Sequence, residues 1–297
     1  MQPRNFIVFI NPISGTRNKK DIRLLIEKKL TELEVSYQVL PTQKDGKYLF
    51  LTEKIKAENI TDVIVCGGDG TVNQITSYLQ KTNVQVGILP MGSGNGLAFT
   101  AGIPKDPAKA LDVILNGKAA FIDAFMINEN YSCHLCGLGF DAQVSHDFAR
   151  QEKRGPSTYV KQTIKNFFKA KPYQFEISSN GKTFSTKAFF VSIANSNQFG
   201  NKILIAPKAS LSDGFLDIVI VNKANKFGLI FKLIKQISSG KIASVRNTDK
   251  TIHYFNTKKI SIKNFDSAPF HIDGEPMETA PAFEIEIIEK AILLLQP

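Results

Sequence analysis

Hydrophobic residues in the first 125 positions follow two alternating spacings. Short β-branched runs, each soon followed by proline or glycine, occupy residues 6–10, 35–40, 62–66 and 84–89. Runs of this kind are typical of strands buried on both faces of a parallel sheet. Between and after these runs, apolar residues recur at helical spacing, which predicts helices over residues 22–33, 72–79 and 104–114. The alternation predicts an α/β domain with a parallel sheet and right-handed crossovers.

Strand-like stretches dominate the rest of the chain. They cover residues 173–178, 188–193, 215–221, 259–262 and 283–288. Asn180-Gly181, which lies between two such stretches, predicts a two-residue hairpin turn. We therefore expect a second, antiparallel β domain that begins near residue 125. Two helical interruptions are expected in it, near residues 157–170 and 226–239.

Composition narrows the class of protein. The 297 residues are 43% apolar and 22% charged, which predicts a packed core and one large or two ordinary domains. No apolar run reaches the roughly 18–20 residues needed to span a bilayer. The apolar run near the start is too short for a secretory signal, and three cysteines exclude a disulfide scaffold. We expect a soluble cytoplasmic protein.

Positive charge is concentrated in the middle of the chain. The net charge is +10 overall, but it is +3 over residues 1–124 and +16 over residues 150–263. Such a field attracts nucleic acid, nucleotide phosphates or an anionic membrane, although solubility alone also explains a diffuse excess of lysine. Because no basic motif is interleaved with aromatic residues, we expect no nucleic-acid partner.

Three turns rich in glycine and small polar residues follow three of the expected parallel strands. Their sequences are Asn11-Pro12-Ile13-Ser14-Gly15-Thr16, Gly67-Gly68-Asp69-Gly70-Thr71 and Pro90-Met91-Gly92-Ser93-Gly94-Asn95-Gly96. The carboxyl ends of parallel strands meet at one edge of a sheet, so we expect these turns to lie together. Glycine lets backbone N–H groups approach phosphate oxygens, and the following helices direct their positive ends there. The turns predict a nucleotide phosphate site; tight turns without a ligand are the alternative.

Asp69 stands out among these residues because a carboxylate repels phosphate. Its presence predicts either a divalent cation between the two groups or a base that takes a proton from an attacking hydroxyl. The Walker sequence, the HRD and DFG sequences of protein kinases and the dinucleotide sequence GxGxxG are all absent from the chain.

The three turns together resemble those of the diacylglycerol kinase and sphingosine kinase family of lipid kinases. The resemblance continues, in order, through Gly137-Leu138-Gly139-Phe140-Asp141-Ala142, Asp213-Gly214-Phe215-Leu216-Asp217 and Phe270-His271-Ile272-Asp273-Gly274-Glu275. It implies an N-terminal three-layer α/β domain with a parallel sheet, similar to NAD kinase and phosphofructokinase, and a C-terminal antiparallel β-sandwich. The first domain would hold residues 1–125 and about 289–297, with a returning strand at 291–295. The second would hold residues 126–288 and bind the lipid.

The same resemblance implies ATP as phosphoryl donor, Mg²⁺ and a lipid hydroxyl as acceptor, with the site in a cleft between the domains. Asp69, Asp273 and Glu275 are the candidate catalytic carboxylates, and the choice of general base among them stays open. The residues implied to hold the nucleotide are Asn11, Pro12, Ser14, Gly15, Thr16, Thr42, Gly67, Gly68, Asp69, Gly70, Thr71, Asn73, Gly92, Ser93, Gly94 and Asn95. Those implied to hold metal are Asp69 and, at a structural site, Ser210, Asp213 and Phe215.

One position departs from the family. Many diacylglycerol kinases have aspartate after the asparagine of the third turn, whereas this chain has Gly96 before Leu97-Ala98, which is more like sphingosine kinases. Diacylglycerol-type and sphingoid-type acceptors therefore both stay open. Two other interpretations are a kinase of a soluble acceptor such as NAD, and an inactive basic homologue that binds membranes. The intact carboxylates Asp69, Asp213, Asp273 and Glu275 argue against loss of activity.

Two of the expected helices have the pattern of helices that lie at a membrane surface. In the first, an apolar stripe that includes Val160, Ile164 and Phe167 adjoins lysines repeated every four residues, and residues 226–237 show a similar pattern. Ordinary surface helices are the alternative. We expect the protein to bind a lipid substrate at an anionic membrane surface reversibly; an oligomer stays open.

Overall fold

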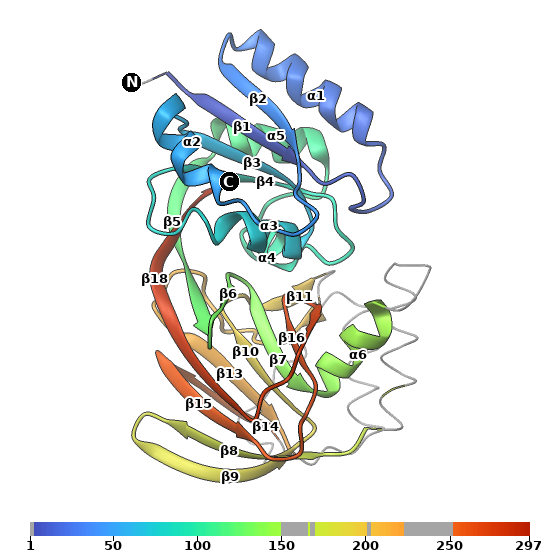
Figure 1. Ribbon diagram of the computed structural model, residues 1–297, viewed down its shortest axis with the longest axis vertical. Helices are drawn as coiled ribbons and strands as arrows, with labels where there is room; N and C mark the ends of the chain where they lie inside the picture. The colour runs from blue at the N-terminus through green and yellow to red at the C-terminus, as the bar shows by residue number, and fades with distance from the viewer. Residues whose placement is uncertain (1–2, 150–165, 167–169, 201–202, 223–251) are drawn as a thin grey trace.

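A computed structural model describes residues 3–149, 166, 170–200, 203–222 and 252–297 of the chain (Figure 1). The two helices expected near residues 157–170 and 226–239 fall almost wholly outside the described residues. Within the described part, no helix is both long enough and apolar enough to cross a membrane.

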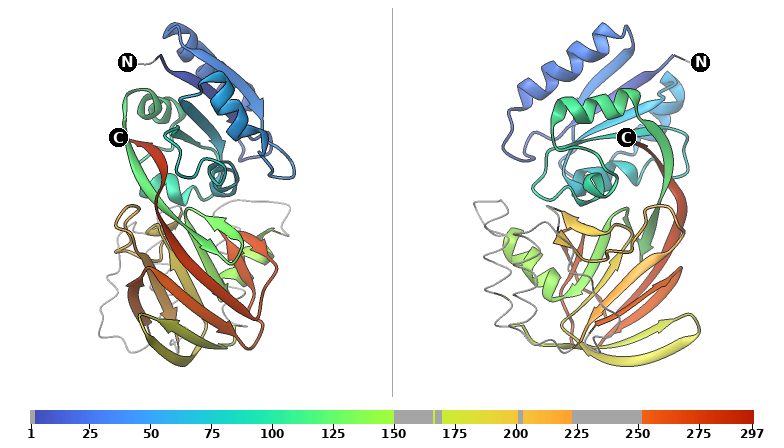
Figure 2. Two further views of the ribbon diagram at one scale, coloured as in Figure 1. Left: turned by 60° about the vertical axis from the view of Figure 1, so that its left-hand side comes forward. Right: turned by 180° about the vertical axis from the view of Figure 1, so that it is seen from behind.

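Four parallel strands form one end of a ten-stranded sheet in the order β2-β1-β3-β4. They are β1 (Asn5–Ile10), β2 (Ser36–Pro41), β3 (Asp62–Gly67) and β4 (Gln85–Pro90). The accompanying helices are α1 (Lys19–Glu32), α2 (Phe50–Glu58), α3 (Asp69–Thr76), α4 (Gly96–Thr100) and α5 (Pro107–Asn116). α1 and α5 cover one face of the sheet and α2 and α3 the other (Figures 1 and 2). All residues of β3 are buried, as the apolar run predicts for a central strand.

The second half of the chain builds a β-sandwich. One layer is the continuation of the ten-stranded sheet, through β18 (Ala282–Gln296), β15 (Lys259–Asn264), β8 (Tyr173–Ser179) and β9 (Lys182–Ala188), with β5 (Lys118–Ile127) and β6 (Asn130–Ser132) alongside. The other layer has six antiparallel strands, β14 (Ile252–Thr257), β13 (Leu216–Val221), β10 (Phe190–Ala194), β7 (Leu135–Gly139), β16 (Phe270–Ile272) and β17 (Glu275–Met277). Buried side chains from both layers, including Phe125 and Phe283 of the first and Leu138 and Ile218 of the second, form the core between them.

Two small elements complete the second half. α6 (Phe140–Ala149) packs against β7, β16 and β17, and a two-stranded ribbon of β11 (Gln198–Gly200) and β12 (Ile203–Leu204) contacts α4. The fold class predicted from the sequence, an α/β domain followed by an antiparallel β-sandwich, is confirmed.

β18 joins the two halves of the molecule. Its first residues pair with β15 in the sandwich, whereas Leu293 and Leu294 pair in parallel with Gln85 and Val86 of β4 (Figure 1). This end of β18 therefore extends the sheet of the four parallel strands. A bulge with Lys290 at a φ of 53° interrupts the pairing with β5 between these two parts.

One predicted strand is wrong in its extent. Residues 188–193 form parts of two strands in different layers, because Ala188 ends β9 and Phe190 begins β10. Phe189 lies at the crossing and donates its backbone N–H to the Val221 carbonyl at 2.7 Å. The apolar run is continuous because the residues on both sides of the crossing are buried. The hairpin at Asn180-Gly181 is confirmed, with φ angles of 50° and 72°.

Candidate functional site

The three glycine-rich turns lie together at the carboxyl ends of the parallel strands. The Asn11 side-chain amide donates to Thr71 Oγ1 at 2.7 Å, and the Met91 N–H donates to the Gly67 carbonyl at 2.8 Å. Gly15 has a φ of +61°, and a Cβ placed there would lie 1.9 Å from the Met91 carbonyl oxygen. Each turn therefore contacts the other two, as expected from strand order.

Glycine is required where the second and third turns meet. A Cβ on Gly92 would lie 2.6 Å from Gly68 Cα, so the two backbones pack directly against each other. Asn95 adopts a left-handed conformation, and its side chain exchanges hydrogen bonds with the backbone of Gly92 at 2.7 and 2.8 Å. The third turn is therefore fixed by its own asparagine.

The second turn leads directly into a helix without a capping side chain. Gly68 is the N-cap residue of α3, and as a glycine it has no side chain that could cap the first turn of this helix. Uncapped N–H groups and the positive end of the helix dipole favour an anion at this place. Asp69 is the first residue of α3, and its Oδ1 accepts a hydrogen bond from the Leu97 N–H at 3.2 Å. Its carboxylate is thereby held against the third turn.

The structure brings the two later carboxylates to the same turns. Glu275 lies against α3, because a Cβ on Gly70 would come within 3.3 Å of Glu275 Cγ. Asp273 is buried, and its Oδ1 accepts hydrogen bonds from Ser132 Oγ at 2.8 Å and from the Leu135 N–H at 3.0 Å. Asp273 Oδ2 is buried and has no hydrogen-bond partner among the described residues.

The surroundings of Asp273 favour its protonated form. Burial raises the pKa of this carboxyl to about 8, and the negative charges of Asp69 and Glu275 act in the same direction. The hydrogen bonds from Leu135 and Ser132 oppose the shift. A carboxyl whose pKa lies near neutrality can accept and release a proton under physiological conditions.

Asn73, predicted to hold the nucleotide, lies between the domains. Its amide donates to the Tyr131 carbonyl at 2.9 Å and accepts from the Cys133 N–H at 3.1 Å. Both polar ends of the side chain are thus engaged by the segment that carries Ser132. This arrangement connects α3 to the residues around Asp273. A second link is the bridge between Asn95 of the third turn and Gly200 of β11.

The remaining predicted residues are less closely grouped. Thr42 follows the end of β2, and Pro12, Ser14 and Thr16 lie on the partly exposed first turn. Ser210, Asp213 and Phe215 belong to the turn before β13. There, Asp213 Oδ1 accepts from the Phe215 N–H at 3.1 Å. No cluster of three or more His, Cys, Asp or Glu side chains suited to a metal ion occurs in the described ranges.

Sequence reasoning missed a buried histidine beside the third turn. A Cβ on Gly96 would lie 2.4 Å from His134 Cε1, and His134 Nδ1 is hydrogen-bonded to Ser196 Oγ. Burial lowers the pKa of His134, while the charge of Asp69 opposes this shift. The glycine that departs from the family pattern is therefore explained by space, because the His134 imidazole and, at 2.8 Å, the Gln198 carbonyl oxygen occupy the volume of a side chain at position 96. No local spacing relates the two residues in the sequence.

We expect Gly96→Ala to destabilise the protein by about 1–3 kcal/mol, because the new methyl group would overlap the His134 ring. In a His134→Ala background the same substitution should cost at least about 0.5 kcal/mol less, as for residues in contact. Urea unfolding of the four proteins in this cycle measures the difference. An equal cost in both backgrounds would show that the imidazole is not what excludes a side chain at position 96.

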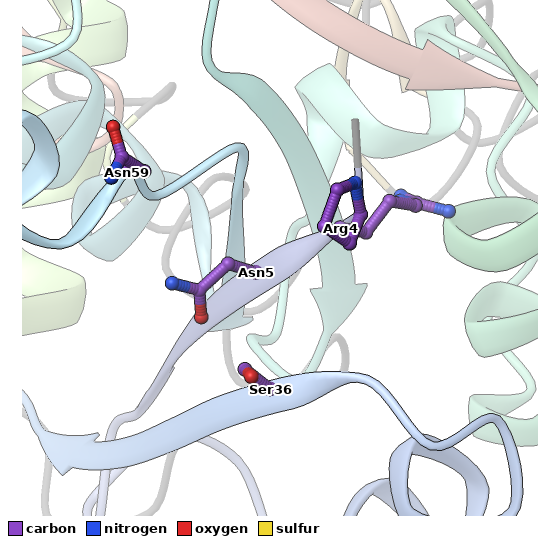
Figure 3. A pocket seen from close by; sticks show the side chains of 5 residues that line it. Arg4, Asn5, Ser36 and Asn59 are labelled. Carbon is purple, nitrogen blue, oxygen red and sulfur yellow. The ribbon is translucent and has the colours of Figure 1, made fainter. Parts of the chain in front are cut away.

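A shallow hollow elsewhere on the first domain does not belong to this site. Pro3, Arg4, Asn5, Ser36 and Asn59 line it (Figure 3). Asn5 and Ser36 are the first residues of β1 and β2, so the hollow lies at the end of the sheet opposite the glycine turns. Arg4 is engaged by Asp62 and by the carbonyls of Ile114 and Leu115. These contacts give Arg4 a structural role.

Comparisons with known proteins agree with this geometry. Residues 5–127 match the model of the diacylglycerol kinase catalytic domain, and residues 135–296 match that of the YegS C-terminal NAD kinase beta sandwich-like domain. A diacylglycerol kinase of Staphylococcus aureus (strain MRSA252) is 30% identical over 95% of this chain and 89% of its own length. The chain belongs to the diacylglycerol kinase and YegS family of lipid kinases. This lipid kinase is thus a phosphotransferase.

Other relatives match this lipid kinase over nearly all of its length. The protein named "Probable lipid kinase YegS-like" of Shewanella frigidimarina (strain NCIMB 400) is 27% identical over 93% of this chain and 94% of its own. A crystal structure of a diacylglycerol kinase from Bacillus anthracis strain Sterne matches with a TM-score of 0.78 at 18% identity. The match covers 100% of this kinase and 98% of the other chain. At that identity the structural likeness supports the fold.

Proposed function

We propose that this lipid kinase transfers the γ-phosphate of ATP to the hydroxyl of a diacylglycerol-type or sphingoid-type lipid. The observation that carries the proposal is the meeting of Asp69, Asp273 and Glu275 with three glycine-rich turns at the carboxyl ends of the parallel strands. Phosphoryl transfer needs donors that hold phosphate and a carboxylate near the acceptor hydroxyl, and little covalent chemistry from the protein.

The nucleotide would be held mainly by main-chain groups. The N–H groups at the start of α3 and in the third turn would donate to the phosphate oxygens, since Gly68 and Gly92 have no side chains that obstruct the approach. Asn11, Ser14, Thr16, Thr71 and Ser93 would add neutral donors around them. Backbone donors fixed by neighbouring turns are already oriented before the ligand arrives, which reduces the entropy lost on binding.

Asp273 is the carboxylate we assign as general base. Its Oδ1 accepts from Ser132 and Leu135, whereas the buried Oδ2 has no partner among the described residues and would be the oxygen that takes a proton from the lipid hydroxyl. With a pKa raised to about 8, the carboxylate form is a stronger base than an ordinary aspartate. Asp69 would then act on the phosphates through a divalent cation, and Glu275 would add negative charge that raises the basicity of Asp273.

The same residues suit a magnesium ion. Asp69 faces the phosphate turns, and carboxylate oxygens together with phosphate oxygens are the ligands that Mg²⁺ prefers. When bound, the ion would neutralise charge between the phosphates and the carboxylates. Asp69 would hold it, and Ser210, Asp213 and Phe215 would hold a second, structural ion through the turn before β13.

The lipid would be reached by reversible binding to an anionic membrane surface from the cytoplasm. The net charge of +16 over residues 150–263 supports this, since each lysine near such a surface contributes about 1 kcal/mol before screening. Vesicle sedimentation at low and high salt tests it. We expect binding to vesicles of anionic lipid that salt reverses, and little binding to neutral vesicles.

The test of the activity is a transfer assay with radiolabelled ATP and Mg²⁺. The acceptors are diacylglycerol, sphingosine, ceramide and phosphatidylglycerol in mixed micelles, with NAD and fructose 6-phosphate as soluble competitors. We expect label in an organic-soluble product formed from a lipid hydroxyl. Label only in a soluble product would favour a kinase of a soluble acceptor, and no transfer to any acceptor would favour an inactive homologue that binds membranes.

A further inference from the structure

Two buried side chains, Asp141 and His271, lie directly behind the turn that carries Asp273 and Glu275. His271 Nε2 is 3.4 Å from Asp141 Oδ2, and His271 Nδ1 accepts a hydrogen bond from the Gly274 N–H at 3.2 Å. The two residues are 5% and 1% exposed, respectively. Because Nδ1 accepts from a backbone donor, the proton of the neutral ring lies on Nε2 and faces Asp141.

The chain makes room for this contact with a glycine in a buried strand. A Cβ on Gly137 of β7 would lie 2.0 Å from Asp141 Oδ2 and 2.7 Å from His271 Nε2. Glycine weakens a strand interior, and it occurs there when another group must approach the backbone closely. The close approach is that of the Asp141 and His271 pair.

The pair connects the turn to an element outside it. Asp141 lies at the start of α6, where its Oδ1 accepts from the Ala142 N–H at 2.9 Å. One turn and a half further along α6, His146 Nε2 is 2.9 Å from the Phe270 carbonyl oxygen. Two side chains of α6, Asp141 and His146, therefore contact β16. The contact made by Asp141 lies next to the turn that carries Asp273 and Glu275.

On one side the turn is held by Asp273, whose N–H donates to the Leu135 carbonyl at 2.8 Å and whose side chain accepts from Ser132 and Leu135; on the Gly274 side it is open. Asp273 and Gly274 both have left-handed φ angles, of 53° and 82°, and β16 and β17 are three residues each. Nothing lies within 4 Å of a Cβ placed on Gly274, so this residue is open on that side. The hydrogen bond to His271 Nδ1 is the one that the described structure gives to the Gly274 N–H.

We propose that His271, oriented by Asp141, is a positioning residue for phosphoryl transfer. By accepting from the Gly274 N–H it keeps the turn in the left-handed conformation that presents Asp273 and Glu275 to α3. This inference rests on the proposed role of Asp273. It assigns to His271 an effect on the rate of transfer and not on the binding of ATP, because neither residue of the pair belongs to the glycine turns.

Two substitutions at His271 separate the two contacts. Asparagine retains an acceptor at the position of Nδ1 and keeps the bond to Gly274, whereas glutamine places a donor near the position of Nε2 and keeps only the bond to Asp141. We expect His271→Gln to lower kcat about 10- to 100-fold with little change in KM for ATP, and His271→Asn to retain most of the activity. His253→Gln, on the exposed side of β14, is the matched control.

Equal kcat values for His271→Gln and wild type would overturn the proposal. Full activity of Asp273→Asn would instead contradict the proposed role of Asp273. The two variants therefore distinguish a failure of the His271 proposal from a failure of the proposed function. A second measurement is the ¹⁵N spectrum of the histidine-labelled protein, recorded for wild type and for Asp141→Leu. We expect one buried imidazole protonated at Nε2 whose signal changes in Asp141→Leu; a proton on Nδ1 of His271 would equally overturn the inference.

Discussion

Replacing Asp273 with asparagine is expected to lower kcat for phosphoryl transfer about 10²- to 10⁴-fold and to leave the protein folded. Asparagine can still accept from Ser132 and Leu135 through Oδ1, so the local hydrogen bonds survive. What is lost is the oxygen that would receive the proton. The measurement is the rate of ATP-dependent labelling of the lipid acceptor, with nucleotide binding followed by calorimetry.

The control is Glu278→Gln, which removes an exposed carboxylate close to the same turn. It should leave kcat unchanged. Wild-type activity in Asp273→Asn would exclude Asp273 as the base and transfer the assignment to Asp69 or Glu275.

The stability of Asp273→Asn should also depend on pH differently from that of wild type. An unfolded aspartate ionises near pH 4, whereas burial raises the pKa of folded Asp273 to about 8. Between these values the folded state binds the additional proton. As the pH rises from about 4 to about 8, the free energy of unfolding of the wild type therefore falls by up to about 1.4 kcal/mol for each pH unit. Relative to wild type, Asp273→Asn should be more stable at pH 8 than at pH 5, as urea unfolding at the two pH values would measure. If the difference in stability between variant and wild type were the same at both pH values, this would contradict the raised pKa of Asp273.

Asp69→Asn is expected to abolish lipid phosphorylation and to change how ATP binding depends on Mg²⁺. The carboxylate stands against the third glycine turn and repels bare phosphates, so we expect wild type to bind ATP much more weakly in EDTA than in Mg²⁺. The neutral amide can keep the bond to the Leu97 N–H but removes that repulsion. The ratio of the Kd for ATP in EDTA to the Kd for ATP in Mg²⁺ should therefore be lower in the variant than in wild type, by a factor of about ten or more, as calorimetry would measure.

Two results would contradict this role. Full activity of Asp69→Asn would remove Asp69 from the mechanism, and an unchanged dependence of Kd on Mg²⁺ would show that no cation is held there. Asp45→Asn, an exposed change in the loop after β2, is the matched control and should affect neither quantity.

The parallel strands and the meeting of the glycine turns could be predicted because both depend on local patterns and on one rule of sheet topology. β1, β3 and β4 are short apolar runs that end in glycine or proline or are soon followed by proline, so the turns after them had to share an edge. Thr71, Asp69 and Gly92 therefore lie close together although 23 positions of sequence separate the last two. Asp273 and Glu275 were found only through the resemblance to a family.

The features that were missed depend on contacts between distant segments. His134 and Gly96 come from different domains, and the space that one leaves for the other has no signature in either local sequence. α2 was missed because only Leu51 in it is buried, so its apolar spacing is weak. The role of Asn73 as a link to Tyr131 and Cys133 was hidden because a side-chain amide suits a phosphate and a backbone equally well.

β18 has a consequence for motion during turnover. A strand of 15 residues that pairs with β15 at one end and with β4 at the other makes the two domains share one sheet. Hinge bending between them would break ladder hydrogen bonds everywhere except at the bulge around Lys290, where pairing is already interrupted. Opening and closing around substrate should therefore be a small rotation centred on that bulge. The products would then be released without a large separation of the two domains.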